Sequence, residues 1–170
     1  MAARVAANLI LGSDGSTTLA GSSAGLSFPA DRVRFHYLRQ AFAAILIGGN
    51  TSRHEPYTST PLPLIVISHD PLPERLRGNE KARAWDLPLS VAVERATGEF
   101  GDLLIESGPA LLKEAIREGL IQELFLTISE KAGGGGLIDP VELTRGTVLL
   151  SSEAVPGGQF LHYRLAPSHD

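Results

Sequence analysis

The sequence predicts an α/β fold in which helices flank a mixed, mostly parallel sheet that ends in a C-terminal antiparallel hairpin. Short, nearly continuous runs of Val, Ile and Leu recur along the chain, and amphipathic segments separate them. Such runs are typical of strands that are buried on both faces, as in a parallel sheet. An alternating segment that follows a Pro-Gly-Gly turn indicates the hairpin. Residues 1–170 are expected to form a single domain.

The strands are expected where the apolar runs lie. The parallel strands are assigned to residues 5–11, 43–47, 64–67 and 103–105, and a further strand to residues 124–128. Residues 148–150 and 160–165 flank Pro156-Gly157-Gly158, and apolar and polar side chains alternate in the second segment. A turn signal between two such segments predicts an antiparallel pair.

Two helices are predicted from their first residues. One opens at Pro29, and the other opens at Pro109 and is ended by Gly119. Proline at a first helical position costs nothing, because that N–H has no partner within the helix. Between the two helices, residues 71–86 are expected to form a loop or a marginal helix. Residues 133–136, four glycines in a row, are expected to form a flexible loop.

The composition excludes several classes of site. The chain contains no cysteine, so thiolate nucleophiles, iron–sulfur clusters and cysteine-ligated zinc are excluded. Its five histidines show no metal-ligand spacing, and we expect no metal site. A net charge of −4 argues against nucleic-acid binding. No apolar stretch approaches the roughly 20 residues that a membrane span needs, and we expect a cytoplasmic protein.

A first candidate site follows the run that ends at Ile47. There the sequence continues as Gly48-Gly49-Asn50-Thr51. Glycines allow close approach of the backbone to a ligand, and Thr51 could cap a short helix whose free N–H groups face an anion. A plain turn at the end of a strand is the alternative. Arg53 lies just beyond and could meet a phosphate, or it could be solvated.

A second candidate site follows Ile105, where the sequence reads Glu106-Ser107-Gly108-Pro109. A buried strand meets a helix N-terminus through a glycine here, an arrangement that holds pyrophosphates in open α/β sheets. A carboxylate buried at a strand end is costly, so Glu106 is expected to have a polar partner or a substrate. A structural capping role for Glu106 is the alternative.

A third candidate segment lies near the N-terminus. Asn8 is a polar residue inside an apolar strand, and Asp14-Gly15 is a turn dipeptide. The Gly- and Ser-rich connection that leads to Ser27 could cover a site. It contains Gly21-Ser22-Ser23-Ala24-Gly25, which matches the G-x-S-x-G pattern of α/β-hydrolases but lacks the buried strand and the helix that this motif requires. We therefore expect residues 21–25 to form a flexible loop.

Taken together, these segments resemble the pyrimidine reductases of riboflavin biosynthesis, the reductase domain of the bifunctional riboflavin deaminase-reductase, which has the dihydrofolate reductase fold. The resemblance covers roughly residues 4 to 165. The segments that carry it are Ser13-Asp14-Gly15, Gly25-Leu26-Ser27-Phe28-Pro29-Ala30-Asp31-Arg32, Leu38-Arg39-Gln40, Ile47-Gly48-Gly49-Asn50-Thr51-Ser52-Arg53, Glu106-Ser107-Gly108-Pro109 and Leu120-Ile121-Gln122-Glu123-Leu124.

The resemblance implies that NADPH binds and that a hydride passes to a ribosylated aminopyrimidine, a chemistry in which the protein supplies orientation and electrostatics. It implies catalytic roles for Glu106 and Asp14 and substrate contacts for Asn8, Ser27 and Arg39. The cofactor-binding residues that it implies are Gly48, Gly49, Asn50, Thr51, Ser68, Ser107, Gly108, Pro109 and Ala110. We expect a small-molecule substrate, a homodimer, and no nucleic-acid or membrane partner.

The sequence departs from the family pattern at two functional positions. Ser107 replaces a glycine, and His54-Glu55-Pro56 replaces an Asp-Asp-Pro motif that helps to bind the substrate. We expect the Ser107 hydroxyl to bond a pyrophosphate oxygen; the alternative is a strained backbone with positive φ. These departures also support a different function, a non-catalytic nucleotide-binding or dimer-forming module on the same fold.

Overall fold

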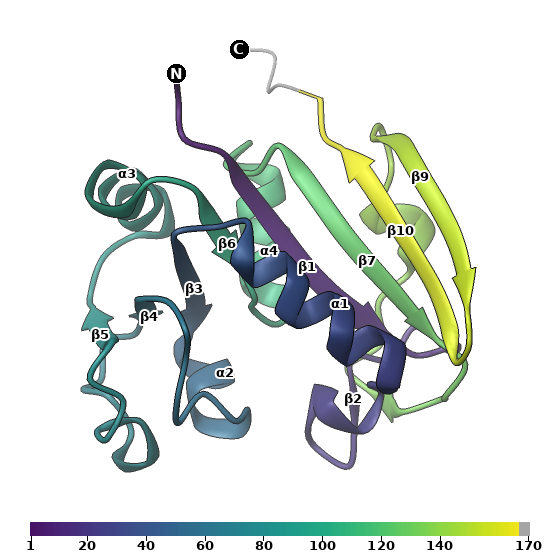
Figure 1. Ribbon diagram of the computed structural model, residues 1–170, viewed down its shortest axis with the longest axis horizontal. Coiled ribbons are helices and arrows are strands. Elements are labelled where there is room, and N and C mark those ends of the chain that lie inside the picture. Colours follow the sequence, from purple (N-terminus) through teal and green to yellow (C-terminus); the bar gives the residue numbers. More distant parts are fainter. Residues whose placement is uncertain (167–170) are drawn as a thin grey trace.

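The computed structural model describes residues 1–166 and is built on one eight-stranded sheet with the order β5-β4-β3-β6-β1-β7-β10-β9 (Figure 1). Neighbouring strands are parallel from β5 to β7, and β10 is antiparallel to both β7 and β9. The predicted mixed, mostly parallel sheet with its C-terminal hairpin is therefore confirmed. The strands are β1 (Val5–Leu11), β3 (Ala44–Gly48), β4 (Leu64–Ile67), β5 (Ala82–Trp85), β6 (Leu103–Ile105), β7 (Glu123–Ser129), β9 (Val148–Val155) and β10 (Gly158–Arg164).

Helices cover both faces of this sheet. In Figure 1, α1 crosses in front of the central strands and α4 lies behind them. The two faces of β1 show the same division, because Ala6 packs with Leu38 of α1, whereas Ala7 packs in the core formed with Ala92 of α3 and Leu112 of α4. The helices are α1 (Pro29–Gln40), α2 (Gly49–His54), α3 (Leu89–Phe100), α4 (Pro109–Arg117) and α5 (Pro140–Leu143).

The two predicted helices begin and end as the sequence indicates. Pro29 and Pro109 are the first residues of α1 and α4, where the missing N–H of proline leaves no helical bond unmade. Gly119 has a φ of 66° just beyond the end of α4. This left-handed conformation is accessible to glycine at little cost, and it turns the chain out of the helix.

The prediction for residues 71–86 was only partly right, and α3 was missed. The segment contains a short 3-10 turn, Glu74–Leu76, but it ends in the edge strand β5. The Ala-Arg-Ala-Trp sequence of β5 is not a continuous apolar run, because an edge strand is only half buried. In α3, the buried Leu89, Ala92, Val93 and Ala96 have the spacing of one helix face, so the signal was present in the sequence.

The two segments predicted to be flexible loops form regular contacts instead. Within residues 133–136, β8 (Gly134–Gly135) pairs antiparallel with β2 (Thr18–Leu19). Gly133 lies against the Thr18 carbonyl, where a side chain would have no room. Residues 23–25 form a 3-10 turn, which is capped by the Ser22 hydroxyl. Backbone pairing across about 115 residues of sequence could not be read from local glycine content.

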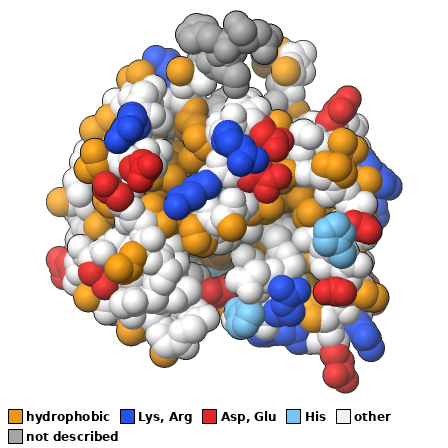
Figure 2. All heavy atoms as spheres, turned by 180° about the vertical axis from the view of Figure 1, so that it is seen from behind, with side chains coloured by type: hydrophobic (Ala, Val, Ile, Leu, Met, Phe, Trp, Pro, Cys, Tyr) orange, Lys and Arg blue, Asp and Glu red, His pale blue; other side chains and the backbone are white. Residues whose placement is uncertain are grey.

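The surface carries both signs of charge. Seen from behind (Figure 2), acidic and basic side chains are interspersed, and apolar side chains are exposed between them. Among residues 1–166, no helix combines the length and the hydropathy that a membrane crossing requires.

Candidate functional site

The carboxyl ends of β3, β4 and β6 place Glu106 and the predicted cofactor-binding residues at one edge of the sheet. Ile47 of β3 pairs with Val66 of β4, and Leu46 of β3 pairs with Ile105 of β6. The segments that follow these strands therefore emerge side by side. In Figure 1, α2 follows β3 at the lower edge of the sheet, and α4 follows β6. Such an edge is where open α/β sheets bind ligands.

The two predicted glycine loops are bonded to each other. The Gly48 N–H donates to Ser107 Oγ at 3.0 Å, and the Gly108 N–H donates to Thr51 Oγ1 at 3.2 Å. Both hydroxyl-bearing residues are buried. These two bonds lock the loop after β3 to the loop after β6, so that the two loops form one surface.

The prediction that Thr51 caps a short helix is wrong, although the helix itself, α2, is present. Gly48 is the N-cap of α2, and Thr51 lies inside the helix. The Thr51 hydroxyl instead accepts from the N–H of Gly108 and so holds the neighbouring loop. Asn50 is exposed, and its carbonyl accepts a bond from His54 Nδ1 at 2.8 Å.

Gly49 forms the floor of a polar cradle. A side chain at this position would meet Ser68 Oγ at 3.1 Å and Arg53 Nη1 at 3.2 Å. A hydroxyl and a guanidinium therefore converge on the bare Cα of Gly49. The Asp70 N–H donates to Ser68 Oγ at 3.0 Å, which fixes the serine side chain and leaves its proton free to donate.

The N-terminus of α4 faces the same edge. Gly108 is its N-cap and makes no side-chain cap bond, and Pro109 occupies the first position. The next N–H groups, those of Ala110 and Leu111, have no acceptor within the helix. An anion at this point would satisfy them and would also benefit from the helix dipole.

Ser107 is not strained. The only non-glycine residue with positive φ among residues 1–166 is Ala20, so the strained alternative for Ser107 is excluded. Its Oγ accepts from Gly48, and its own proton is available to a ligand.

We expect Ser107→Gly to weaken NADPH binding by about 0.5–1.5 kcal/mol, because the pyrophosphate loses the hydroxyl as a donor. The free energy of unfolding should fall by a similar amount, about 0.5–1.5 kcal/mol, because the Gly48 N–H loses its acceptor. Isothermal titration and urea unfolding measure the two effects. A glycine variant that binds NADPH tenfold more tightly would identify the serine as an obstruction.

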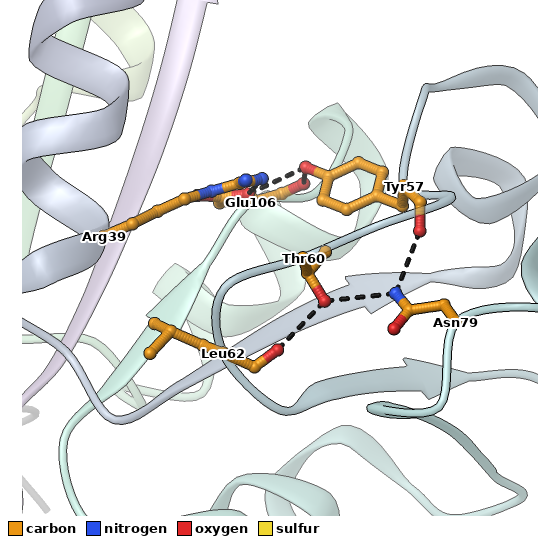
Figure 3. Close-up of polar contacts among 6 residues, drawn as sticks. All are labelled: Arg39, Tyr57, Thr60, Leu62, Asn79 and Glu106. Atoms are coloured by element: carbon orange, nitrogen blue, oxygen red, sulfur yellow. Dashed lines mark hydrogen bonds and ion pairs between the residues drawn. The ribbon is translucent and has the colours of Figure 1, made fainter.

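Glu106 has the polar partner that its burial requires. Its Oε1 accepts from Arg39 Nε at 2.9 Å, and its Oε2 accepts from Arg39 Nη2 at 2.7 Å (Figure 3). The two side chains are 3% and 9% exposed. Burial alone would lower the pKa of the Arg39 guanidinium, but the bonds and charge of Glu106 outweigh burial and raise that pKa. Arg39 thus faces Glu106, and substrate contact by Arg39 stays a prediction.

Asn8 lies on the same face of the sheet as this ion pair. Ala6 of β1 pairs with Leu104 of β6, and both pack toward α1. Asn8 and Glu106 are each two residues further along, so they project to the α1 face near its carboxyl edge. Asn8 is half-buried.

Asp14 and Ser27 make bonds that hold loops, and those of Asp14 tie the turn after β1 to residues 133–134. Asp14 accepts from the Ser16 hydroxyl and from the N–H groups of Ser16, Gly133 and Gly134. The Ser16 hydroxyl and these N–H groups lower the pKa of Asp14 to about 2. Ser27 Oγ donates to Asp31 at 2.6 Å. None of these bonds links Asp14 or Ser27 to the Arg39–Glu106 pair, and their roles toward a ligand stay predictions.

Asp14 borders a hollow on the other side of the sheet. This hollow has a volume of about 480 Å³, and Leu126, Ile128 and Leu161 contribute to its apolar lining. Leu126 belongs to the core that faces α3 and α4, whereas Glu106 lies toward α1. The two predicted catalytic carboxylates therefore have different surroundings.

Sequence reasoning missed Glu55 and Tyr57 as functional candidates. Glu55 accepts from Ser22 Oγ at 2.9 Å and from the Ser23 N–H at 2.7 Å, and so ties the segment after β2 to the end of α2. The Tyr57 hydroxyl donates to Glu106 Oε2 at 2.9 Å. Neither contact had a local signal, because its partners lie more than 30 residues apart in the sequence.

The sequence matches one family model over most of its length. The model is described as the RibD C-terminal domain, and it matches residues 3–159. No curated protein matches the chain.

Solved structures with the same fold are numerous. One of them, from Thermotoga maritima, aligns with a TM-score of 0.78 at 15% identity over 96% of this chain. It is described as a diaminohydroxyphosphoribosylaminopyrimidine deaminase/5-amino-6-(5-phosphoribosylamino)uracil reductase. This chain spans 57% of that protein. A pyrimidine reductase-like protein from Corynebacterium diphtheriae aligns with a TM-score of 0.73 at 22% identity, over 98% of this chain and 93% of that one.

A dihydrofolate reductase is also similar. The enzyme from Enterococcus faecalis, in complex with NADP(H), aligns with a TM-score of 0.68 at 13% identity over 95% of both chains. At these identities the likeness shows the fold alone, and that fold is the dihydrofolate reductase fold expected from the sequence.

Proposed function

This chain belongs to the RibD C-terminal domain family, and on that premise we propose that it is an NADPH-dependent reductase. Its proposed reaction transfers a hydride to a ribosylated aminopyrimidine or a related small molecule. The proposal depends above all on the two interlocked loops, in which Gly48 bonds Ser107 and Gly108 bonds Thr51. They join a glycine cradle and a helix N-terminus into one surface at the ligand-binding edge of the sheet.

The residues at this edge fit a phosphorylated dinucleotide. The bare Cα of Gly49 admits close approach between Ser68 Oγ and Arg53 Nη1. This pair can hold a phosphate by a hydroxyl bond and a charge-assisted bond. The free N–H groups of Ala110 and Leu111 at the start of α4 suit a second anion, the pyrophosphate.

In this mechanism the protein orients NADPH and the substrate, and no covalent bond of the protein is formed or broken. NADPH, when bound, supplies the hydride. Ser107 and the first turn of α4 would bind the pyrophosphate of NADPH, and Arg53 with Ser68 would bind its 2′-phosphate. On the α1 face, Glu106 is held by Arg39 as a fixed acceptor for an amino or ring N–H donor of the substrate.

We expect NADPH to bind at least about tenfold more tightly than NADH, because charge-assisted bonds to the 2′-phosphate contribute about 1.5–3 kcal/mol. Arg53→Gln should remove most of this preference while NADH affinity is retained. Arg77→Gln, a change at an exposed arginine, serves as the matched control. Fluorescence titration at modest ionic strength measures the six dissociation constants, those of NADPH and NADH for each of the three proteins, and equal wild-type affinities would contradict the prediction.

A turnover assay distinguishes the proposed reductase from the alternative function, a non-catalytic module on the same fold. Oxidation of NADPH, followed at 340 nm with ribosylaminopyrimidines of different phosphorylation state, tests the proposed reaction directly. Saturable oxidation that requires the aminopyrimidine supports the reductase. Tight NADPH binding without any oxidation would favour the non-catalytic module instead.

A further inference from the structure

Tyr57 lies behind the candidate site, in the segment that connects α2 to β4. Its side chain is buried together with Ile45 and Val66 in a small hydrophobic cluster that is separate from the main core. The hydroxyl donates to Glu106 Oε2 at 2.9 Å (Figure 3). Tyr57 lies outside the sequence motifs from which the candidate site was predicted.

The backbone of Tyr57 is fixed from the far side. Asn79 Nδ2 donates to the Tyr57 carbonyl and to Thr60 Oγ1, each at 3.1 Å. Thr60 Oγ1 in turn donates to the Leu62 carbonyl at 2.9 Å. Figure 3 shows these bonds as a continuous chain from Leu62 to Glu106. Asn79 is itself buried, so the tyrosine backbone is held by a group in the protein interior.

The bonds to Glu106 are distributed unequally over its two oxygens. Oε2 accepts from Arg39 Nη2 and Tyr57, whereas Oε1 accepts, within residues 1–166, only from Arg39 Nε. A carboxylate oxygen has two acceptor positions, so Oε2 is filled and Oε1 keeps one position. Burial, together with the charge of Glu106, raises the pKa of Tyr57 well above its ordinary value, so the phenol stays a donor.

We propose that Tyr57 is a positioning residue that acts through Glu106: with Arg39, it fixes the carboxylate so that Oε1 is the acceptor presented to an N–H donor of the substrate. This inference rests on the proposed reductase function. Arg39 alone binds both oxygens and leaves one acceptor position on each. The tyrosine removes that ambiguity, because it occupies the second position on Oε2.

Tyr57→Phe tests the proposal, since phenylalanine keeps the buried ring and removes only the donor. We expect kcat/KM for the aminopyrimidine to fall by about tenfold to a hundredfold, the loss expected for one bond to a charged group. NADPH affinity should stay within about twofold, because the Tyr57 hydroxyl bonds Glu106 and none of the four residues that join the cofactor loops, Gly48, Thr51, Ser107 and Gly108. Tyr37→Phe, at a tyrosine that is 71% exposed on α1, is the matched control and should keep wild-type values.

A double-variant cycle distinguishes positioning from mere packing. In a Glu106→Gln background, Tyr57→Phe should change kcat/KM by less than about twofold, because its effect passes through the carboxylate. Wild-type kcat/KM in Tyr57→Phe, or full additivity with Glu106→Gln, would overturn the proposal.

A second measurement is independent of turnover. The carboxyl ¹³C resonance of Glu106 should move in Tyr57→Phe and stay in place in Tyr37→Phe. If the wild-type protein reduces no aminopyrimidine, the proposed function fails, and this resonance alone decides whether Tyr57 positions Glu106. A resonance that does not move in Tyr57→Phe overturns the proposal under either result.

Discussion

Arg39→Met is expected to lower the free energy of unfolding by about 3–5 kcal/mol, because it leaves an uncompensated charge inside the protein. Glu106 is 6% exposed as a residue, and of the three bonds that the described part of the chain donates to its carboxylate, two come from Arg39. Methionine fills much of the volume of the arginine stem, so the loss reports mainly on the buried carboxylate. Since natural domains are stable by only about 5–15 kcal/mol, this single change should shift urea unfolding strongly.

Two variants make the measurement specific. Arg83→Met breaks the Arg83–Glu99 pair, whose side chains are 54% and 37% exposed, and should cost less than about 1 kcal/mol. In the double variant Arg39→Met/Glu106→Gln, no charge is left buried at this place, and part of the lost stability should return. If Arg39→Met lowers the free energy of unfolding no more than Arg83→Met does, the buried Arg39–Glu106 pair contributes little to stability.

The parts of the fold that could be predicted from the sequence are those with local causes. The central strands are nearly continuous apolar runs because helices cover them on both faces. The starts of α1 and α4 follow from the positions of two prolines. In contrast, β5 at the sheet edge lacks such a run, and α3 was overlooked although its apolar spacing is helical.

The candidate site was predictable as a set of loops, but its bonds were not. Adjacent parallel strands explain why the segments after Ile47 and Ile105 meet. The partners of Glu106 could not be derived, because Arg39 lies 67 positions and Tyr57 lies 49 positions away in the sequence. Burial of a carboxylate demanded some partner, and only the packing of α1 and of the segment after α2 determines which one.

Glu106→Gln is expected to lower kcat/KM for the aminopyrimidine by at least about a hundredfold while NADPH affinity stays within a few-fold. The amide removes the negative charge, and its NH₂ group must replace one of the two oxygens that accept from Arg39. A donor then faces a donor, so the side chain loses both its charge and its fixed orientation. The cofactor loops are bonded through Gly48, Ser107, Thr51 and Gly108 and do not depend on this carboxylate.

The comparison must be made on folded protein, because this change also weakens the buried pair. Circular dichroism at the assay temperature establishes that, and Glu99→Gln is the control for loss of a carboxylate in an exposed ion pair. Stopped-flow reduction under single-turnover conditions then separates hydride transfer from substrate binding. If Glu106→Gln keeps both the wild-type hydride-transfer rate and the wild-type substrate affinity, the carboxylate does not bind or orient the substrate. The Arg39–Glu106–Tyr57 cluster would then serve only to join α1, β6 and the segment after α2.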